Sequence, residues 1–166
     1  MLDHTDPRRV AQRDIQAIAT EAQYLRKLPS SKVLRMIMAG TVKDFPGQSV
    51  LLKEGSQIEE VYLILHGTVV VGLYGGIDPT LWLYVSGPGT VVDMCALLEP
   101  PVSPVTIRAL SDVEVLAIPR TVFAELIREE TAVGYEILQN YCTRLSMINQ
   151  VTLKQFSQEY PGPSRN

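Results

Sequence analysis

The chain has 166 residues, of which 46% are hydrophobic and 20% are charged, a composition typical of one globular domain. The net charge of −3 and the pI of about 5.4 leave no general basic field that would attract DNA or RNA. The N-terminus has no apolar secretory segment, and the longest apolar region, 61–74, is broken by His66 and Gly67 and is too short to cross a membrane as a helix. With only two distant cysteines, we expect a cytoplasmic protein without a membrane partner.

Two helices are predicted in the first 40 residues, which we assign to an N-terminal helical segment, 1–40. The first helix covers 8–28, where apolar residues recur at helical spacing at Ile15, Ile18, Ala22 and Leu25. The second helix is shorter and stops near Gly40.

Short β-rich runs separated by glycine or proline turns fill the middle of the chain, 41–119. No helix-length segment lies between them, which excludes a Rossmann-type parallel sheet and favours a sandwich or a closed roll. The predicted strands are SVLLK (49–53), EVYLILH (60–66), TVVVGLY (68–74), TLWLYV (80–85), PVTIRAL (104–110) and VEVLAI (113–118).

The helical pattern returns over 120–157, as a short amphipathic helix (120–130) and a long helix from Thr131 to roughly Phe156. We expect the tail, 158–166, to be disordered. Five residues of the long helix recur in steps of three and four, the spacing of a coiled-coil seam: Leu138, Tyr141, Leu145, Ile148 and Thr152. The seam predicts a homodimer, and the alternative is packing against the roll of the same chain.

Three segments carry a resemblance to a known family: PGQSVLLKEGSQIEEVYLILHGTVVV (46–71), GTVVDMCALLEPPVSPVTIRALSDVEVLAIPRTVF (89–123) and NYCTRLSMIN (140–149). The order and spacing of their glycines and apolar runs, over roughly 25–156, resemble the cyclic nucleotide-binding domain family, and the last segment is similar to its bacterial catabolite-activator branch. The resemblance implies a mainly β fold with flanking helices. We expect a cupin-like double-stranded β-helix, or jelly roll, with a long C-terminal helix.

The resemblance also implies a ligand pocket at a phosphate-binding cassette. In the family, backbone N–H groups at the start of a short helix point at a cyclic phosphate, a glutamate binds the ribose hydroxyl, and an arginine pairs with the phosphate. Here the Gly-Glu pair of the family falls on Asp93 and Met94, and the arginine falls on Ser103, so the cassette is degenerate. The pocket residues implied are Gly89, Asp93, Met94, Cys95, Ala96, Leu97, Ser103, Val105 and Thr106.

Asp93 precedes a short predicted helix, 94–97, where aspartate is a strong N-cap. Its carboxylate would then occupy the N–H groups that a phosphate needs, and would repel a phosphate by roughly 1 to 4 kcal/mol at ~4 Å. Asp93 either selects against anions or simply caps a helix on a retained scaffold. We favour the cap.

Two other polar residues are candidates for ligand contact. Strand alternation puts Val105 and Ile107 on the face that Ser103 shares, so Arg108 should point away from the cassette. On the long helix, the resemblance puts the base-contacting positions of the family at Ile148 and Asn149. Asn149 is a candidate contact to a base, although an asparagine facing solvent is the simpler interpretation.

Catalytic chemistry is not expected from this sequence. A metal enzyme on a cupin-like roll needs about three inward-facing His or carboxylate ligands. The chain has only His4 and His66, and no nucleophile–base pair stands at a suggestive spacing. We therefore expect no metal, no cofactor and no enzyme activity. Cys95 could carry a stabilised thiolate at the cassette helix, but burial is the commoner fate of a free cysteine.

Three functional hypotheses follow. The first is a stand-alone regulatory or signalling module that does not bind cAMP or cGMP in the usual way and acts through an unknown protein partner. The second is a sensor that binds a cyclic nucleotide or another small ligand in the roll, and the third is a metal enzyme. Transcription regulators of the family continue into a helix-turn-helix domain, and this sequence ends at Asn166 before one, so we expect no direct nucleic-acid contact.

Overall fold

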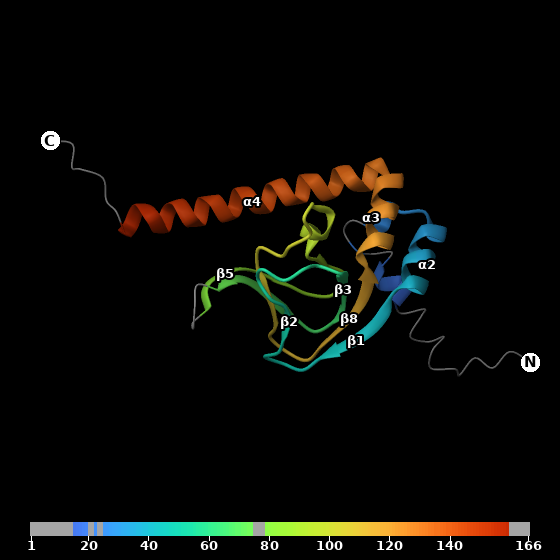
Figure 1. Cartoon of the computed structure of the whole chain (residues 1–166), viewed down its shortest axis with the longest axis horizontal. Helices are drawn as coiled ribbons and strands as arrows, with labels where there is room; N and C mark the ends of the chain where they lie inside the picture. Colours follow the sequence, from blue (N-terminus) through green and yellow to red (C-terminus); the bar gives the residue numbers. More distant parts are fainter. Residues whose placement is uncertain (1–14, 20–21, 23–24, 75–78, 160–166) are drawn as a thin grey trace, which may run out of the picture.

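The computed structural model describes residues 15–19, 22, 25–74 and 79–159, and Figure 1 shows a β-roll with helices at one end and a long helix lying across it. The described strands form two four-stranded antiparallel sheets, in the orders β1-β8-β3-β6 and β2-β7-β4-β5. The predicted jelly roll with flanking helices is therefore confirmed. The strands are β1 (Thr41–Phe45), β2 (Val50–Leu52), β3 (Glu60–His66), β4 (Val69–Tyr74), β5 (Pro79–Ser86), β6 (Val91–Val92), β7 (Thr106–Ala109) and β8 (Val113–Pro119).

The helices differ from the sequence prediction mainly at the N-terminus. Residues 15–19 are helical, but Ala22 lies in a bend and a 3-10 turn follows, so the described part of 8–28 is not one continuous helix. Residues 8–14 and 160–166 lie outside the described part of the chain. The helical elements are η1 (Leu25–Lys27), α2 (Ser30–Ala39), η2 (Met94–Leu97), α3 (Arg120–Glu129) and α4 (Thr131–Glu159).

The central strand β3 contributes to two hydrophobic cores. Tyr62 and Ile64 point into the interior of the roll, whereas Val61, Leu63 and Leu65 pack with the helices on the outer face of the sheet. All of 61–65 is therefore buried, which explains why this strand reads as a continuous apolar run. The outer core fixes the helices to the roll, and thereby places α4 over it.

The turn between β3 and β4 requires the glycine at position 67. Gly67 has a φ of 83°, in the left-handed region that glycine adopts without strain. A Cβ at this position would lie 2.2 Å from the carbonyl oxygen of Asp112. The close approach joins this turn to the loop that precedes β8.

Candidate functional site

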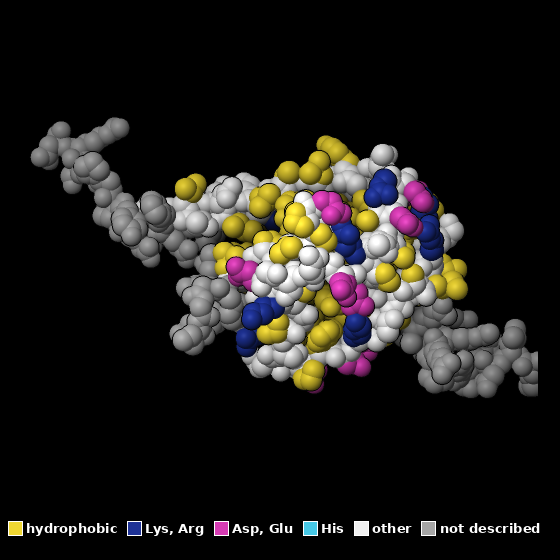
Figure 2. Space-filling model, in the orientation of Figure 1, with side chains coloured by type: hydrophobic (Ala, Val, Ile, Leu, Met, Phe, Trp, Pro, Cys, Tyr) yellow, Lys and Arg dark blue, Asp and Glu magenta, His cyan; other side chains and the backbone are white. Residues whose placement is uncertain are grey.

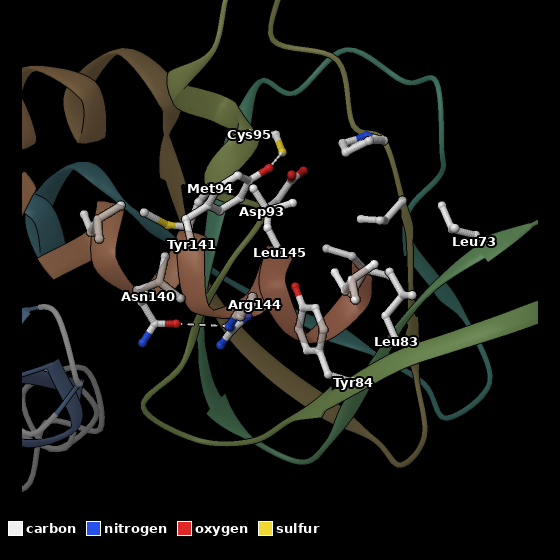
Figure 3. A pocket seen from close by; sticks show the side chains of 16 residues that line it. Leu73, Leu83, Tyr84, Asp93, Met94, Cys95, Asn140, Tyr141, Arg144 and Leu145 are labelled. Carbon is white, nitrogen blue, oxygen red and sulfur yellow. Dashed lines mark hydrogen bonds between the residues drawn. The ribbon is translucent and has the colours of Figure 1, made fainter. Parts of the chain in front are cut away.

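A cavity of about 200 Å³ lies between the roll and α4. Figure 3 shows the segment Asp93–Cys95 on one side of it, Leu83 and Tyr84 of β5 on another, and α4 across it. Concave, mostly apolar spaces with a few polar groups are the usual form of small-molecule sites, so this cavity is the candidate site. It is lined by Leu73, Leu83, Tyr84, Val91, Asp93, Met94, Cys95, Pro104, Val105, Ile107, Ile137, Asn140, Tyr141, Arg144, Leu145 and Ile148.

The structure brings some of the predicted pocket residues to the cavity and leaves others away from it. Asp93, Met94, Cys95 and Val105 line its walls. The remaining predicted residues, Gly89, Ala96, Leu97, Ser103 and Thr106, do not. The cassette therefore reaches the cavity mainly through the first two residues of η2 and the aspartate before them.

Asp93 does not cap η2, contrary to the sequence prediction. It stands at the N-cap position, but its side chain makes no capping hydrogen bond, because its backbone is left-handed, with φ 68° and ψ 54°. Glycine adopts this conformation most easily, and the resemblance places the glycine of the family here. The chain thus keeps the backbone of a glycine and adds a carboxyl group.

The carboxyl group of Asp93 is buried without a hydrogen-bond partner. The residue is 6% exposed, and neither carboxyl oxygen has a partner among the described residues. Burial raises the pKa of this group from 3.8 to about 7, and the nearby Ser103 hydroxyl opposes the rise. That hydroxyl has one proton, however, and donates it to the carbonyl oxygen of Val105 at 2.9 Å.

Among the described residues, four titratable groups whose pKa values Asp93 affects carry no positive charge. Its carboxylate raises the pKa of the Tyr62, Tyr84 and Tyr141 hydroxyls and of the Cys95 thiol, although burial is the larger cause for each. All four groups are neutral at ordinary pH, so none can form an ion pair with Asp93.

The strand after the cassette has no cation that faces the cavity. Ser103, where the resemblance expects an arginine, is 1% exposed, and its backbone N–H donates to the Ser56 carbonyl oxygen at 2.9 Å. Val105 and Ile107 line the cavity, as the predicted alternation requires, and Arg108 is not among the lining residues. The expectation that Arg108 points away from the cassette is confirmed.

Comparison with known proteins decides the family. Residues 42–130, more than half of the chain, match the family model of the cyclic nucleotide-binding domain. The chain belongs to the cyclic nucleotide-binding domain family. No curated protein matches its sequence at a significant level.

Several solved structures share the fold. PKAR CBD2 with Sp-2Cl-cAMPS bound has a TM-score of 0.69 and 16% identity, over 87% of this chain and 95% of that chain. The Thermus thermophilus catabolite activator protein has a TM-score of 0.66 and 21% identity, over 81% of this chain and 62% of its own. The sensor domain of the transcriptional regulator DNR from Pseudomonas aeruginosa has a TM-score of 0.65 and 14% identity, over 95% and 97%. At these identities the likeness shows the fold alone.

This chain is shorter than some of the proteins that it matches. It spans 62% of the Thermus thermophilus protein and 66% of a matching protein from Ruegeria pomeroyi. It therefore corresponds to part of those proteins.

Three polar residues of this cyclic nucleotide-binding domain, Tyr84, Asn140 and Arg144, line the cavity. They were not predicted as site residues from the sequence. The Arg144 guanidinium lies 4.4 Å from the centre of the Tyr84 ring, and its Nε donates to Asn140 Oδ1 at 3.1 Å. Asn149, the candidate base contact, is exposed and does not line the cavity, which agrees with the simpler interpretation of an asparagine facing solvent. The spacing of Asn140, Arg144 and Ile148 in steps of four along one helix face was the available signal.

Cys95 and Tyr141 join the cassette to α4 within the cavity wall. The Cys95 sulfur lies 3.0 Å from the Tyr141 hydroxyl oxygen, as Figure 3 shows, and Cys95 is 5% exposed. Burial raises the pKa of the thiol, and the hydrogen bond to Tyr141 opposes this. A raised pKa keeps the group as an unreactive thiol at neutral pH.

The predicted seam of α4 divides between the cavity and the surface. Tyr141, Leu145 and Ile148 line the cavity, whereas Leu138 is 58% exposed and Thr152 is exposed. Further apolar side chains of α4 are exposed, and Figure 2 shows hydrophobic atoms along the edge where this helix lies. They are Tyr135, Met147 and Leu153.

The described part of the chain carries neither a metal-binding cluster nor a membrane-spanning helix. Its residues contain no cluster of three or more His, Cys, Asp or Glu suited to a metal ion. None of the helices described has both the length and the apolar character needed to cross a bilayer.

Proposed function

We propose that this chain is a regulatory or signalling module that does not bind cAMP or cGMP in the usual way and acts through contacts with another protein. The proposal rests on one observation, the buried Asp93 carboxyl in the cavity wall. When ionised, it would repel a cyclic phosphate at ~4 Å by roughly 1 to 4 kcal/mol.

Nothing in the cassette offsets this repulsion. Ser103 carries no charge, and Met94 cannot accept a hydrogen bond from a ribose hydroxyl as a glutamate does. Arg144 is the one cation among the described residues that line the cavity, and it comes from α4 and stacks on Tyr84. Its position supports a role in holding β5 to the helix.

The test is calorimetric titration of the purified chain with cAMP and cGMP. We expect no binding at micromolar ligand, because the cassette lacks both side chains that hold the nucleotide in the family. A matched variant, Asp93→Gly with Met94→Glu and Ser103→Arg, restores the residues of the family and should gain measurable affinity. Micromolar binding by the unaltered chain would overturn the proposal.

A second candidate function is a sensor for a different small molecule. It is favoured by the cavity itself, which remains open between the roll and α4 although the residues that hold a cyclic nucleotide are replaced. A ligand there would contact η2 and α4 together. Its binding could therefore change the exposed surface of α4 that a protein partner would contact.

The regulatory module proposed first is also expected to form a homodimer through α4. Leu138, which is 58% exposed, and Leu145, which lines the cavity but is still 44% exposed, are seven residues apart, the heptad spacing of a coiled coil. The net charge of −3 supports a module that makes no direct contact with nucleic acid. We assign this module to the cytoplasm.

A further inference from the structure

The carboxyl group of Asp93 is the least satisfied polar group of the cavity. Both of its oxygens are buried without a partner among the described residues, and the residue lines the cavity. A buried carboxylate without a donor is costly, and an ionised carboxylate has room for several hydrogen bonds. Such a group indicates a ligand that supplies the missing donor.

We propose that the cavity binds a small, uncharged, mostly apolar molecule that donates a hydrogen bond to the Asp93 carboxylate. This inference rests on the second candidate function, since it treats the cavity as a ligand site and assigns its ligand class. It gives Asp93 the role of the residue that determines specificity.

The apolar character of the ligand follows from the walls. Val91, Val105 and Ile107 line the cavity from the roll, and Leu145 and Ile148 line it from α4. These side chains offer no hydrogen bonds, so the body of the ligand gains by leaving water. Polar substituents along these walls would lose their hydrogen bonds to water without replacement.

The neutral charge of the ligand follows from the two ionisable groups of opposite sign in the walls. An anion would face Asp93. A cation would share the cavity with Arg144, which already has partners in Asn140 and the Tyr84 ring, and would lose its hydration on entry. A hydroxyl or an amide N–H gives Asp93 its donor without either penalty.

Several hydrogen-bonding groups in and beside the cavity already have partners. The Cys95 thiol and the Tyr141 hydroxyl bond to each other, and the Ser103 hydroxyl, adjacent to the cavity, donates to Val105. Among the described lining residues, the Asp93 carboxylate is the buried acceptor that still lacks a donor. A ligand that lacks this donor would leave the carboxylate unpaired.

A matched series of three probes tests the inference: 2-naphthol, 2-methoxynaphthalene and 2-naphthoate. They share one apolar ring system and differ in a neutral donor, a neutral group without a donor, and an anion. Binding is measured by calorimetry at about pH 8, where Asp93 is mostly ionised because burial puts its pKa at about 7. We expect the affinity for 2-naphthol to be at least about tenfold higher than that for 2-methoxynaphthalene, and 2-naphthoate to bind most weakly.

Two variants of Asp93 and one control assign the preference to this residue. Asp93→Gly suits the left-handed backbone and removes the carboxyl, so 2-naphthol and the ether should bind equally. Asp93→Asn keeps one oxygen as an acceptor and should retain part of the preference. Glu114→Gln removes one negative charge from an exposed position of β8 and should change nothing.

Three results would overturn the inference. They are equal affinity of the unaltered chain for 2-naphthol and the ether, a preference that survives in Asp93→Gly, and no saturable binding of any probe. The titration with cAMP and cGMP is separate, so failure of the proposed function is recognised by nucleotide binding, whatever the three probes show.

Discussion

Asp93 combines two energetically unfavourable features. A non-glycine residue stands in the left-handed region, and its carboxyl group is buried without a donor. Both features persist only where the surrounding structure holds them, and such residues are concentrated at functional sites. The position therefore distinguishes this cassette from one that has merely lost its ligand-binding side chains.

The pH dependence of stability is the direct test of this buried carboxyl. Below pH 3.8 the group is protonated in both states and costs nothing, but as the pH rises towards about 7 the unfolded chain releases the proton first. The penalty is complete above that pH and corresponds to about 4 kcal/mol. We expect the free energy of unfolding of Asp93→Gly, minus that of the unaltered chain, to grow over this range and then level off.

Urea unfolding at several pH values measures this difference. The other groups near Asp93 do not interfere, because Tyr62, Tyr84, Cys95 and Tyr141 have pKa values raised above their ordinary ones. Asp44→Asn, which alters an exposed carboxyl of β1, provides the control and should show no such trend. If the difference in free energy of unfolding between Asp93→Gly and the unaltered chain did not change with pH, the pKa of the Asp93 carboxyl would not be raised by burial.

The sequence predicted the chemistry of position 93 but not the direction of its side chain. An aspartate at the start of the cassette indicated both a conflict with anions and a helix cap. The choice between these depends on φ, and a left-handed residue turns its carboxyl away from the first N–H groups of η2. Sequence alone does not supply that angle, because aspartate tolerates both conformations.

At the scale of elements, Arg120 attaches the cassette to the start of α3. Its Nε donates to the carbonyl oxygen of Ala96 at 2.6 Å, a terminal nitrogen donates to that of Leu98 at 3.3 Å, and it pairs with Glu99. These carbonyls lie at the end of η2, where helix carbonyls lack partners within the helix. The side chain therefore stabilises the end of η2 and fixes it to α3.

Removal of this side chain should loosen the cassette selectively. We expect Arg120→Ala to lower the free energy of unfolding by about 1 to 3 kcal/mol, because the partly buried carbonyl of Ala96 and the exposed carbonyl of Leu98 lose a charged donor. Hydrogen exchange over 94–99 should also become faster. Arg35→Ala provides the control, since its ion pair with Glu125 is half exposed on both sides and such pairs contribute little. Equal effects of the two substitutions would contradict the role assigned to Arg120.

Element boundaries were predictable where the apolar pattern was long. β3, β8 and α4 stand close to their predicted ranges, because each buries a continuous or periodic set of side chains. β1 was not predicted as a separate strand, because its side chains are exposed or partly buried and none is fully buried. β6 has two residues and is defined by pairing with β3, which no local pattern reveals.

For the whole molecule, the jelly roll and its long helix followed from the sequence, but the cavity did not. Its walls come from β4, β5, the cassette, the segment before β7 and α4, which are far apart in the chain. Which face of α4 meets the roll is decided by packing between these segments. The seam pattern was compatible both with pairing to a second helix and with packing against the roll. In the structure, Tyr141, Leu145 and Ile148 of the seam line the cavity.

Because α4 exposes apolar side chains, the association state is the property of the whole molecule to test. The helix has 29 residues, about 44 Å in length, and Figure 1 shows it extending past the roll. Leu138 is 58% exposed and does not line the cavity, so it can be changed without altering the candidate site. We expect a dimer in sedimentation velocity at micromolar concentration, and a monomer for Leu138→Glu.

The control for this substitution is Met38→Glu on α2, which is 72% exposed and adds the same charge away from α4. It should leave the dimer intact. Because two copies of Leu138 would approach each other in a symmetric pair, a glutamate there buries two like charges, which is far more costly than one exposed charge. A monomeric unaltered chain, or a dimer that survives Leu138→Glu, would mean that the exposed apolar side chains of α4 serve another partner.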